Sequence, residues 1–282
     1  MGAVGTLVAR DVKVFLRSRA SLVFTCSSVV LCLLFLAFFR PQVVVQVSRI
    51  LPGGSDAAAD AWVFGSVAAL SGFSSSASVL VGFVEARLSG RFGLQLTSAK
   101  RWQVVLGYVV SSVLVSLVVS VVIVLLGQVW ALAAGRPLMT ILQWLQILLG
   151  LLLSAAFFTG LNAVALRFIV SHVAFGAYCL IMGTMAGILS FSLVPLQGNI
   201  AQFVGALPFF QTAALVRGPL LASAVQSLGA DPATIDSLSY ALGTVVRLGG
   251  SWPPGLTAFF LLLWTVLALV CAFLLLTRSL QD

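Results

Sequence analysis

The chain has 282 residues, of which 61% are hydrophobic and only 8% are charged, and its mean hydropathy is +1.16. A soluble domain carries about 25% charged residues, so this composition excludes an ordinary soluble protein. The net charge is +8, but the positive charges flank apolar segments instead of forming one patch. That distribution is typical of membrane proteins and argues against a nucleic-acid partner.

Six stretches contain no Asp, Glu, Lys, Arg or His and are long enough to cross a membrane as helices. They cover residues 20–39, 62–84, 104–126, 141–166, 173–194 and 256–276. A charge at the bilayer centre costs about 2.5–3.5 kcal/mol. Helices of about 20 residues satisfy every backbone group internally, whereas barrel strands alternate in polarity over about 10 residues. We therefore predict an all-α integral membrane protein, a single transmembrane domain over residues 1–282 with six transmembrane helices.

Lys and Arg residues are distributed unequally between the two sides of this topology. Ten lie on the side of the two termini, and five lie on the other side. The ten are Arg10, Lys13, Arg17, Arg19, Arg87, Arg91, Lys100, Arg101, Arg167 and Arg278, and the five are Arg40, Arg49, Arg136, Arg217 and Arg247. Because positive charges favour the cytoplasmic side, we predict both termini in the cytoplasm and a location in the plasma or inner membrane.

Two segments outside the spans have patterns of their own. Near the N-terminus, Arg10, Lys13 and Arg17 recur at helical spacing, with apolar residues on another face. This predicts an interfacial helix with a basic face, although simple positive-inside anchoring also explains the charges. The external link at about 196–255 mixes prolines with apolar segments too short to span. It predicts short re-entrant helices in the outer leaflet.

The cytoplasmic link between the second and third spans carries an apolar stripe. Val84, Leu88 and Phe92 are spaced four residues apart, beside charged Glu85, Arg87 and Arg91. Such a segment can dock on a cytosolic protein while it remains rooted in the membrane. A solvated loop is the alternative interpretation.

This link, in its place among six spans, resembles the ABC transporter type-2 permease family. The residues that carry the resemblance are Thr97-Ser98-Ala99-Lys100-Arg101-Trp102, then Gly107, and later Leu207-Pro208 followed by Arg217 and Leu220-Leu221. The resemblance covers nearly the whole chain in topology. It implies a connecting helix at residues 10–19, a coupling helix at 85–99 against a nucleotide-binding subunit, and a smaller coupling contact at 167–172. The implied coupling residues are Glu85, Arg87, Leu88, Arg91, Phe92, Arg167 and His172.

The same resemblance implies the permease subunit of an exporter that moves an amphiphile, such as a drug, peptide or lipid, outward. Two permease units, identical or paralogous, would work with two cytosolic ATPases. The sequence has no GxxxxGK[ST] loop, which is the loop that binds nucleotide phosphates in many ATPases. We therefore expect ATP and Mg to bind to the partner ATPase, and we expect no cofactor on this chain. The one histidine and the one glutamate form no catalytic cluster, and the four cysteines lack metal-ligand spacing, so neither an enzyme site nor a metal site is expected.

The serine-rich second span allows two interpretations. The hydroxyl groups could line a substrate path, or they could let helices pack closely and hydrogen-bond. The candidate path residues are Ser71, Ser74, Ser75, Ser78, Met182 and Met185. Two glycines of the fifth span, Gly183 and Gly187, match the small-xxx-small pattern of a helix contact and, like the first span, are candidates for the contact with a second permease.

Two other transport functions are the alternatives to an amphiphile exporter. One is an ion-coupled secondary transporter, although proton coupling normally uses an ionisable residue at membrane depth and the six predicted spans contain none. A sodium site made of backbone carbonyls stays open. The other is a permease for a polysaccharide or another polar polymer.

Overall fold

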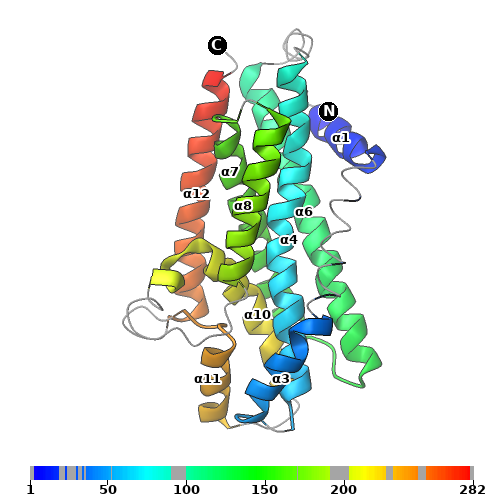
Figure 1. Ribbon diagram of the computed structural model, residues 1–282, viewed down its shortest axis with the longest axis vertical. Helices are drawn as coiled ribbons and strands as arrows, with labels where there is room; N and C mark the ends of the chain where they lie inside the picture. The colour runs from blue at the N-terminus through cyan, green and yellow to red at the C-terminus, as the bar shows by residue number, and fades with distance from the viewer. Residues whose placement is uncertain are drawn as a thin grey trace.

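The computed structural model describes residues 3–18, 23, 30, 34, 36–51, 53–89, 100–169, 171–190, 203–226, 231–246 and 252–279. Over these residues the protein is helical and contains no strand (Figure 1), which confirms the all-α prediction. The helices are α1 (Ala3–Arg17), α3 (Arg40–Ser48), α4 (Ser55–Leu88), α6 (Arg101–Ala133), α7 (Ile141–Leu166), α8 (His172–Ser190), α10 (Pro208–Gln226), α11 (Pro232–Ala241) and α12 (Pro254–Ser279).

Five of these helices are long and apolar enough to cross a membrane, judged by length and composition: α4, α6, α7, α8 and α12. They correspond to the second to sixth predicted spans and support a membrane-embedded protein. The predicted first span, residues 20–39, lies outside the described residues except for a few positions. The boundaries of α7 agree with the prediction, and Thr140 caps its first turn by accepting a hydrogen bond from the Gln143 amide at 3.4 Å.

The long helices alternate in direction. In Figure 1, α4, α7 and α12 run toward the end of the bundle where the C-terminus lies, and α6 and α8 run away from it. The α1 helix packs beside α6 near this end, whereas α3 and α11 lie at the opposite end. Consecutive long helices therefore run antiparallel. The α4 helix packs on α6 and α6 packs on α7, whereas α8 packs on α4.

The centre of the bundle is α4, which contacts α3, α6, α7, α8 and α10. Most of its side chains are buried, including Trp62, Leu80 and Phe83. It begins earlier and ends later than the predicted second span, so the first residues of the predicted cytoplasmic link continue the helix to Leu88. By contrast, α8 and α12 present large apolar side chains outward, which suits helices that face lipid.

The N-terminal segment, where the cation spacing predicts a helix, forms α1. Phe15 is buried against Val79 of α4 and Val115 of α6. The Arg10 guanidinium lies 5.9 Å from the centre of the Tyr108 ring. Lys13 and Arg17 are exposed, so the helix packs with one apolar edge on the bundle and keeps two cations in solvent.

The glycine pair of α8 faces the inside of the chain. A Cβ atom at Gly183 would lie 3.3 Å from the Phe73 ring, and one at Gly187 would lie 3.9 Å from Leu70. Both neighbours belong to α4. The α8 helix therefore uses this glycine face to pack against α4 within the chain, and a contact between α8 and a second permease stays a prediction.

Candidate coupling end and polar interior

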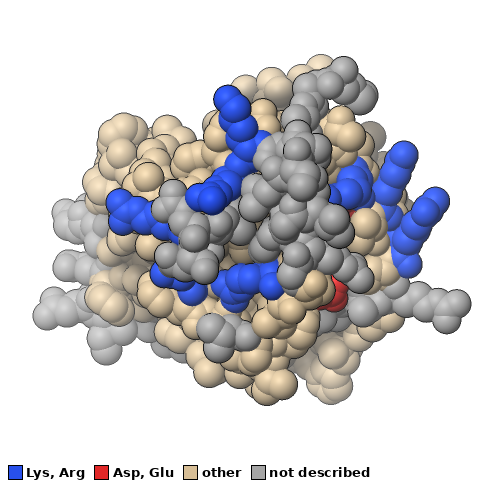
Figure 2. Space-filling view, turned by 90° about the horizontal axis from the view of Figure 1, so that it is seen from above, with Lys and Arg blue, Asp and Glu red and all other residues tan. Residues whose placement is uncertain are grey.

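One end of the bundle gathers most of the described cations, and we call it the basic end. It comprises α1 and the ends of the long helices nearest the C-terminus (Figure 1). Its cations are Arg10, Lys13, Arg17, Arg87, Lys100, Arg101, Arg167 and Arg278, whereas its described acids are Asp11 and Glu85. Figure 2, which views the molecule from this end, shows many blue side chains and little red. A surface of this kind attracts anionic partners or an anionic membrane leaflet.

Arg87 joins the two segments that the sequence predicts as coupling contacts. It lies in the last turn of α4 and donates a hydrogen bond to the carbonyl of Leu166 at 2.9 Å and another to the carbonyl of Ile169. These carbonyls belong to the end of α7 and to the turn before α8. The last carbonyls of a helix lack intrahelical donors, so the guanidinium completes the end of α7 and holds it to α4.

The other predicted coupling residues that the structure describes lie at the same end. Glu85 and His172 are exposed, Arg167 is half-buried, and Leu88 is 49% exposed. Arg91 and Phe92, with the rest of residues 90–99, lie outside the described residues.

The structure adds two exposed apolar side chains at the basic end that sequence analysis missed. Phe168 is 73% exposed, directly after α7, and Trp102 is 44% exposed in the first turn of α6. Phe168 falls within the predicted contact at 167–172, so its apolar character was the available signal. Exposed aromatic side chains beside cations are typical of surfaces that bind a partner.

Hydroxyl and amide groups hydrogen-bond across the interior of the bundle. Ser71 of α4 pairs with Ser120 of α6 at 2.8 Å. Ser76 of α4 accepts a hydrogen bond from the Asn162 amide of α7 at 2.7 Å, and the Tyr178 hydroxyl of α8 donates to the Asn162 carbonyl oxygen at 2.9 Å. These bonds connect α4 with α6 and with α7, and they connect α7 with α8. Polar contacts of this kind hold helices together in lipid, where apolar burial gives little drive for association.

The candidate path residues lie on α4 and α8, and none of them lines the cavity described below between α7, α10, α11 and α12. Ser71, Ser75 and Ser78 are buried, Ser74 is half-buried, and both Ser74 and Ser78 donate to α4 carbonyls. Two methionines complete the set. Met182 packs on an aromatic cluster, whereas Met185 is exposed; these are residues of α8. A path lined by these residues stays a prediction.

The opposite end of the bundle contains a cluster of paired charges, and we call it the paired end. The buried Asp60 carboxylate accepts hydrogen bonds from Arg40 Nε at 2.5 Å, Arg136 Nη1 at 2.7 Å and Trp130 Nε1 at 3.0 Å. Arg40 also pairs with Asp56 at 2.6 Å. The hydrogen bond that Arg40 donates to Asp60 raises the pKa of Arg40. Together these contacts join α3, α4 and the segment that follows α6.

Arg217 of α10 is fully buried. Its Nε donates to Ser66 Oγ at 2.7 Å, its Nη1 donates to the Leu242 carbonyl at 3.3 Å, and its guanidinium lies 5.2 Å from the Trp62 ring centre. A Cβ atom at Gly65 would lie 2.9 Å from Arg217 Cγ, so this glycine makes room for the side chain. Sequence analysis placed Arg217 in an external link. The structure instead places it inside the bundle, beside α4.

Comparison with protein-family models and with curated proteins finds no match to this chain. Within the described ranges, no group of three or more His, Cys, Asp or Glu side chains could hold a metal ion. Function is therefore inferred from the residues of the chain and from their placement in the bundle.

Proposed function

We propose that this chain is the membrane-spanning permease subunit of an ATP-driven exporter, and that the basic end faces the cytoplasm. Both termini are then cytoplasmic. Residues 20–39 supply the first of the six spans, and α10 and α11 lie in the outer leaflet. A partner chain supplies the ATPase site, and a second permease, identical or paralogous, completes the path. The exported molecule is an amphiphile.

The observation that carries this proposal is the double hydrogen bond of Arg87. The family resemblance implies two separate coupling contacts, at 85–99 and at 167–172. Arg87 ties the first to the second through the carbonyls of Leu166 and Ile169. A cytosolic subunit that pushes on either segment would therefore act on both, and on α4 and α7 together.

Because α4 lies at the centre of the bundle, a force applied to its cytoplasmic end would act on the helices that pack around it. This helix contacts most of the other long helices and hydrogen-bonds with α6 and α7 through its serines. A closely packed helix moves as a rigid element with its neighbours and does not bend locally. Movement of its cytoplasmic end would therefore reposition the helices around it.

Leu88 offers a direct test, because this half-exposed leucine lies at the predicted contact. A carboxylate buried in an apolar interface without a partner is strongly unfavourable. We expect Leu88→Asp to insert into the membrane normally, but to lower the ATPase activity that co-purifies with the chain by about tenfold or more. Leu138→Asp is the matched control, since Leu138 is similarly exposed in the loop before α7.

The measurement uses the complex purified from native membranes in mild detergent, assayed for vanadate-sensitive ATP hydrolysis and weighed by native mass spectrometry. The proposal expects two permeases with two ATPases, and loss of the ATPases in Leu88→Asp alone. A wild-type species with one permease and no ATPase would overturn it. Wild-type ATPase activity in Leu88→Asp would show that this end does not couple to an ATPase.

A further inference from the structure

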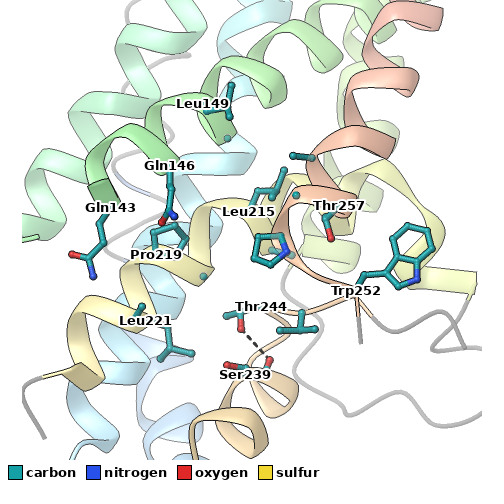
Figure 3. Close-up of a pocket in the computed structure, with 18 of the residues that line it drawn as sticks. Gln143, Gln146, Leu149, Leu215, Pro219, Leu221, Ser239, Thr244, Trp252 and Thr257 are labelled. Carbon is teal, nitrogen blue, oxygen red and sulfur yellow. Dashed lines mark hydrogen bonds between the residues drawn. The ribbon is translucent and has the colours of Figure 1, made fainter. Parts of the chain in front are cut away.

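A large cavity lies between α7, α10, α11 and α12, within the part of the chain that the structure describes. Its volume is about 750 Å³. Figure 3 shows Gln143, Gln146 and Leu149 of α7 on one side of it and Thr257 and Trp252 across from them. Small-molecule sites occupy about 300–1,000 Å³ and have mostly apolar walls with a few polar groups. The volume and lining of this cavity fit that class.

The described wall of the cavity is apolar and carries no charged side chain. Leu149, Leu153, Leu215, Leu221 and Val225 form much of it. An ionised ligand head would lose its hydration there without gaining a counter-charge, which is strongly unfavourable. The wall therefore selects against anions and cations.

Uncharged hydrogen-bonding groups interrupt this apolar wall. They are the amide of Gln146 and the hydroxyls of Ser239, Thr244 and Thr257. Pro219 leaves one backbone carbonyl without its helical hydrogen bond, because a proline inside a helix has no N–H to donate to the carbonyl four residues earlier. That carbonyl belongs to Leu215, which also lines the cavity. A ligand with hydroxyl groups could bind to these donors and acceptors.

The cavity opens toward the side of the bundle near the paired end. Leu149 and Gln146 of α7 are exposed at its rim, as is Gly255 at the start of α12. These residues lie in the first three turns of α7 and the first turn of α12, two helices that are apolar enough to span a membrane. A ligand can therefore enter from the lipid phase, with its apolar chain still in an apolar medium.

We propose that this cavity binds an uncharged amphiphile with one acyl chain and a hydroxylated head, of the monoacylglycerol class. The acyl chain contacts the leucine wall, and the head hydrogen-bonds with Gln146, Thr257 and the backbone near Pro219. This inference does not depend on the export function, because binding requires neither an ATPase nor a second permease.

Two residues of α10 allow the cavity to be filled without disturbing its walls. A Cβ atom at Gly218 would have nothing within 4 Å, and Ala222, one turn later, is exposed. Both line the cavity. A phenylalanine at either position should occupy the space of the acyl chain. Gly176→Phe is the matched control, because Gly176 of α8 also has open space and lies outside the cavity lining.

The probe is radiolabelled 1-oleoylglycerol, titrated against the delipidated full chain in detergent, with 1-oleoylglycerol 3-phosphate as the charged competitor. We expect one saturable site per chain, and Gly218→Phe and Ala222→Phe should each raise its Kd by about tenfold or more. Gly176→Phe should bind as the wild type does, and the phosphate should compete poorly. Unfolding midpoints establish that each variant is folded.

Three results would overturn the proposal. Non-saturable binding, or equal binding by the filled variants, would mean that the lipid only coats the outer surface. Equal competition by the phosphate would mean that charge is not excluded. A dimer that ignores 1-oleoylglycerol but dissociates in Gly218→Phe would mean that a second copy of the chain occupies the cavity. None of these results would bear on the ATPase test.

Discussion

The two ends of the bundle treat charge in opposite ways. At the paired end, Asp60 is buried and binds two arginines and a tryptophan, so the charges satisfy each other within the chain. At the basic end, the described cations outnumber the described acids, and Arg87 binds backbone carbonyls and no carboxylate of the described residues. Exposed apolar side chains, among them Leu88 and Phe168, accompany these cations.

At the paired end the charged groups bind each other within the chain, whereas at the basic end charged and apolar groups are exposed to other molecules. Ion pairs with little exposure fix the packing of helices and leave few charges for other molecules. An excess of cations over acids beside exposed apolar groups suits an anionic leaflet or a docked protein. We therefore expect the paired end to stabilise the packing of the helices and the basic end to bind a leaflet or a protein. Each expectation can be tested separately.

The largest effect on stability is expected from Asp60→Asn at the paired end. Breaking a fully buried ion pair costs about 3–5 kcal/mol, but the side chains of Arg40 and Arg136 are 26% and 21% exposed. Because water screens these groups, we expect a loss of about 2 kcal/mol, measured as a lower thermal unfolding midpoint in detergent. Asp236→Asn, on an exposed residue of α11, is the control. Equal midpoints for the two variants would contradict the structural role of the cluster.

A smaller effect is expected from Arg87→Met at the basic end. The change removes the donor to Leu166 and Ile169 and keeps an apolar chain of similar length. Hydrogen bonds to charged groups contribute about 1.5–3 kcal/mol, and the half-exposure of Arg87 reduces this to about 1 kcal/mol. Hydrogen exchange should become faster at the end of α7 and in the turn that follows. Arg278→Met, which removes an exposed cation of the same end, should leave exchange there unchanged.

The smallest effect concerns the docking of α1. Burial raises the pKa of the Asp11 carboxyl above its ordinary value of 3.8, and Arg10 offsets part of this rise. The Asp11 carboxyl therefore binds its proton more tightly when α1 is docked on the bundle than when α1 is free. Docking should weaken as the pH rises from 3.8 to the raised pKa and stay constant above it. A spin label at Leu16→Cys would report this as increasing mobility, which Asp11→Asn should abolish. Docking that strengthens with pH would mean that the Arg10 pairing outweighs burial.

The sequence predicted those features that depend on local pattern. The apolar run at 141–166 became α7 with the same boundaries, because Thr140 supplies a cap before it and charged Arg167 follows it. Cation spacing likewise predicted the helical N-terminus. The boundaries of α4 were less accurate, since a charge-free stretch marks where a helix meets polar surroundings and not where its hydrogen bonding ends.

Features that depend on distant contacts were not predictable. Arg217 reads as a loop cation, and only the approach of α4, with Ser66 and Gly65 opposite it, shows that it is buried. Asp60 lies two residues before a charge-free stretch, and nothing local indicates its partners Arg40 and Arg136. The cavity likewise combines four helices that are separated in the chain.

Orientation is the claim on which the export proposal depends most directly, and cysteine labelling in intact cells measures it. The four native cysteines would first be replaced by alanine. A membrane-impermeant maleimide added outside should label Ala134→Cys, an exposed position at the paired end, and should not label Ser89→Cys, an exposed position at the basic end, until the cells are opened. External labelling of Ser89→Cys in intact cells, with Ala134→Cys protected, would place the basic end outside and contradict the proposed coupling to a cytosolic ATPase.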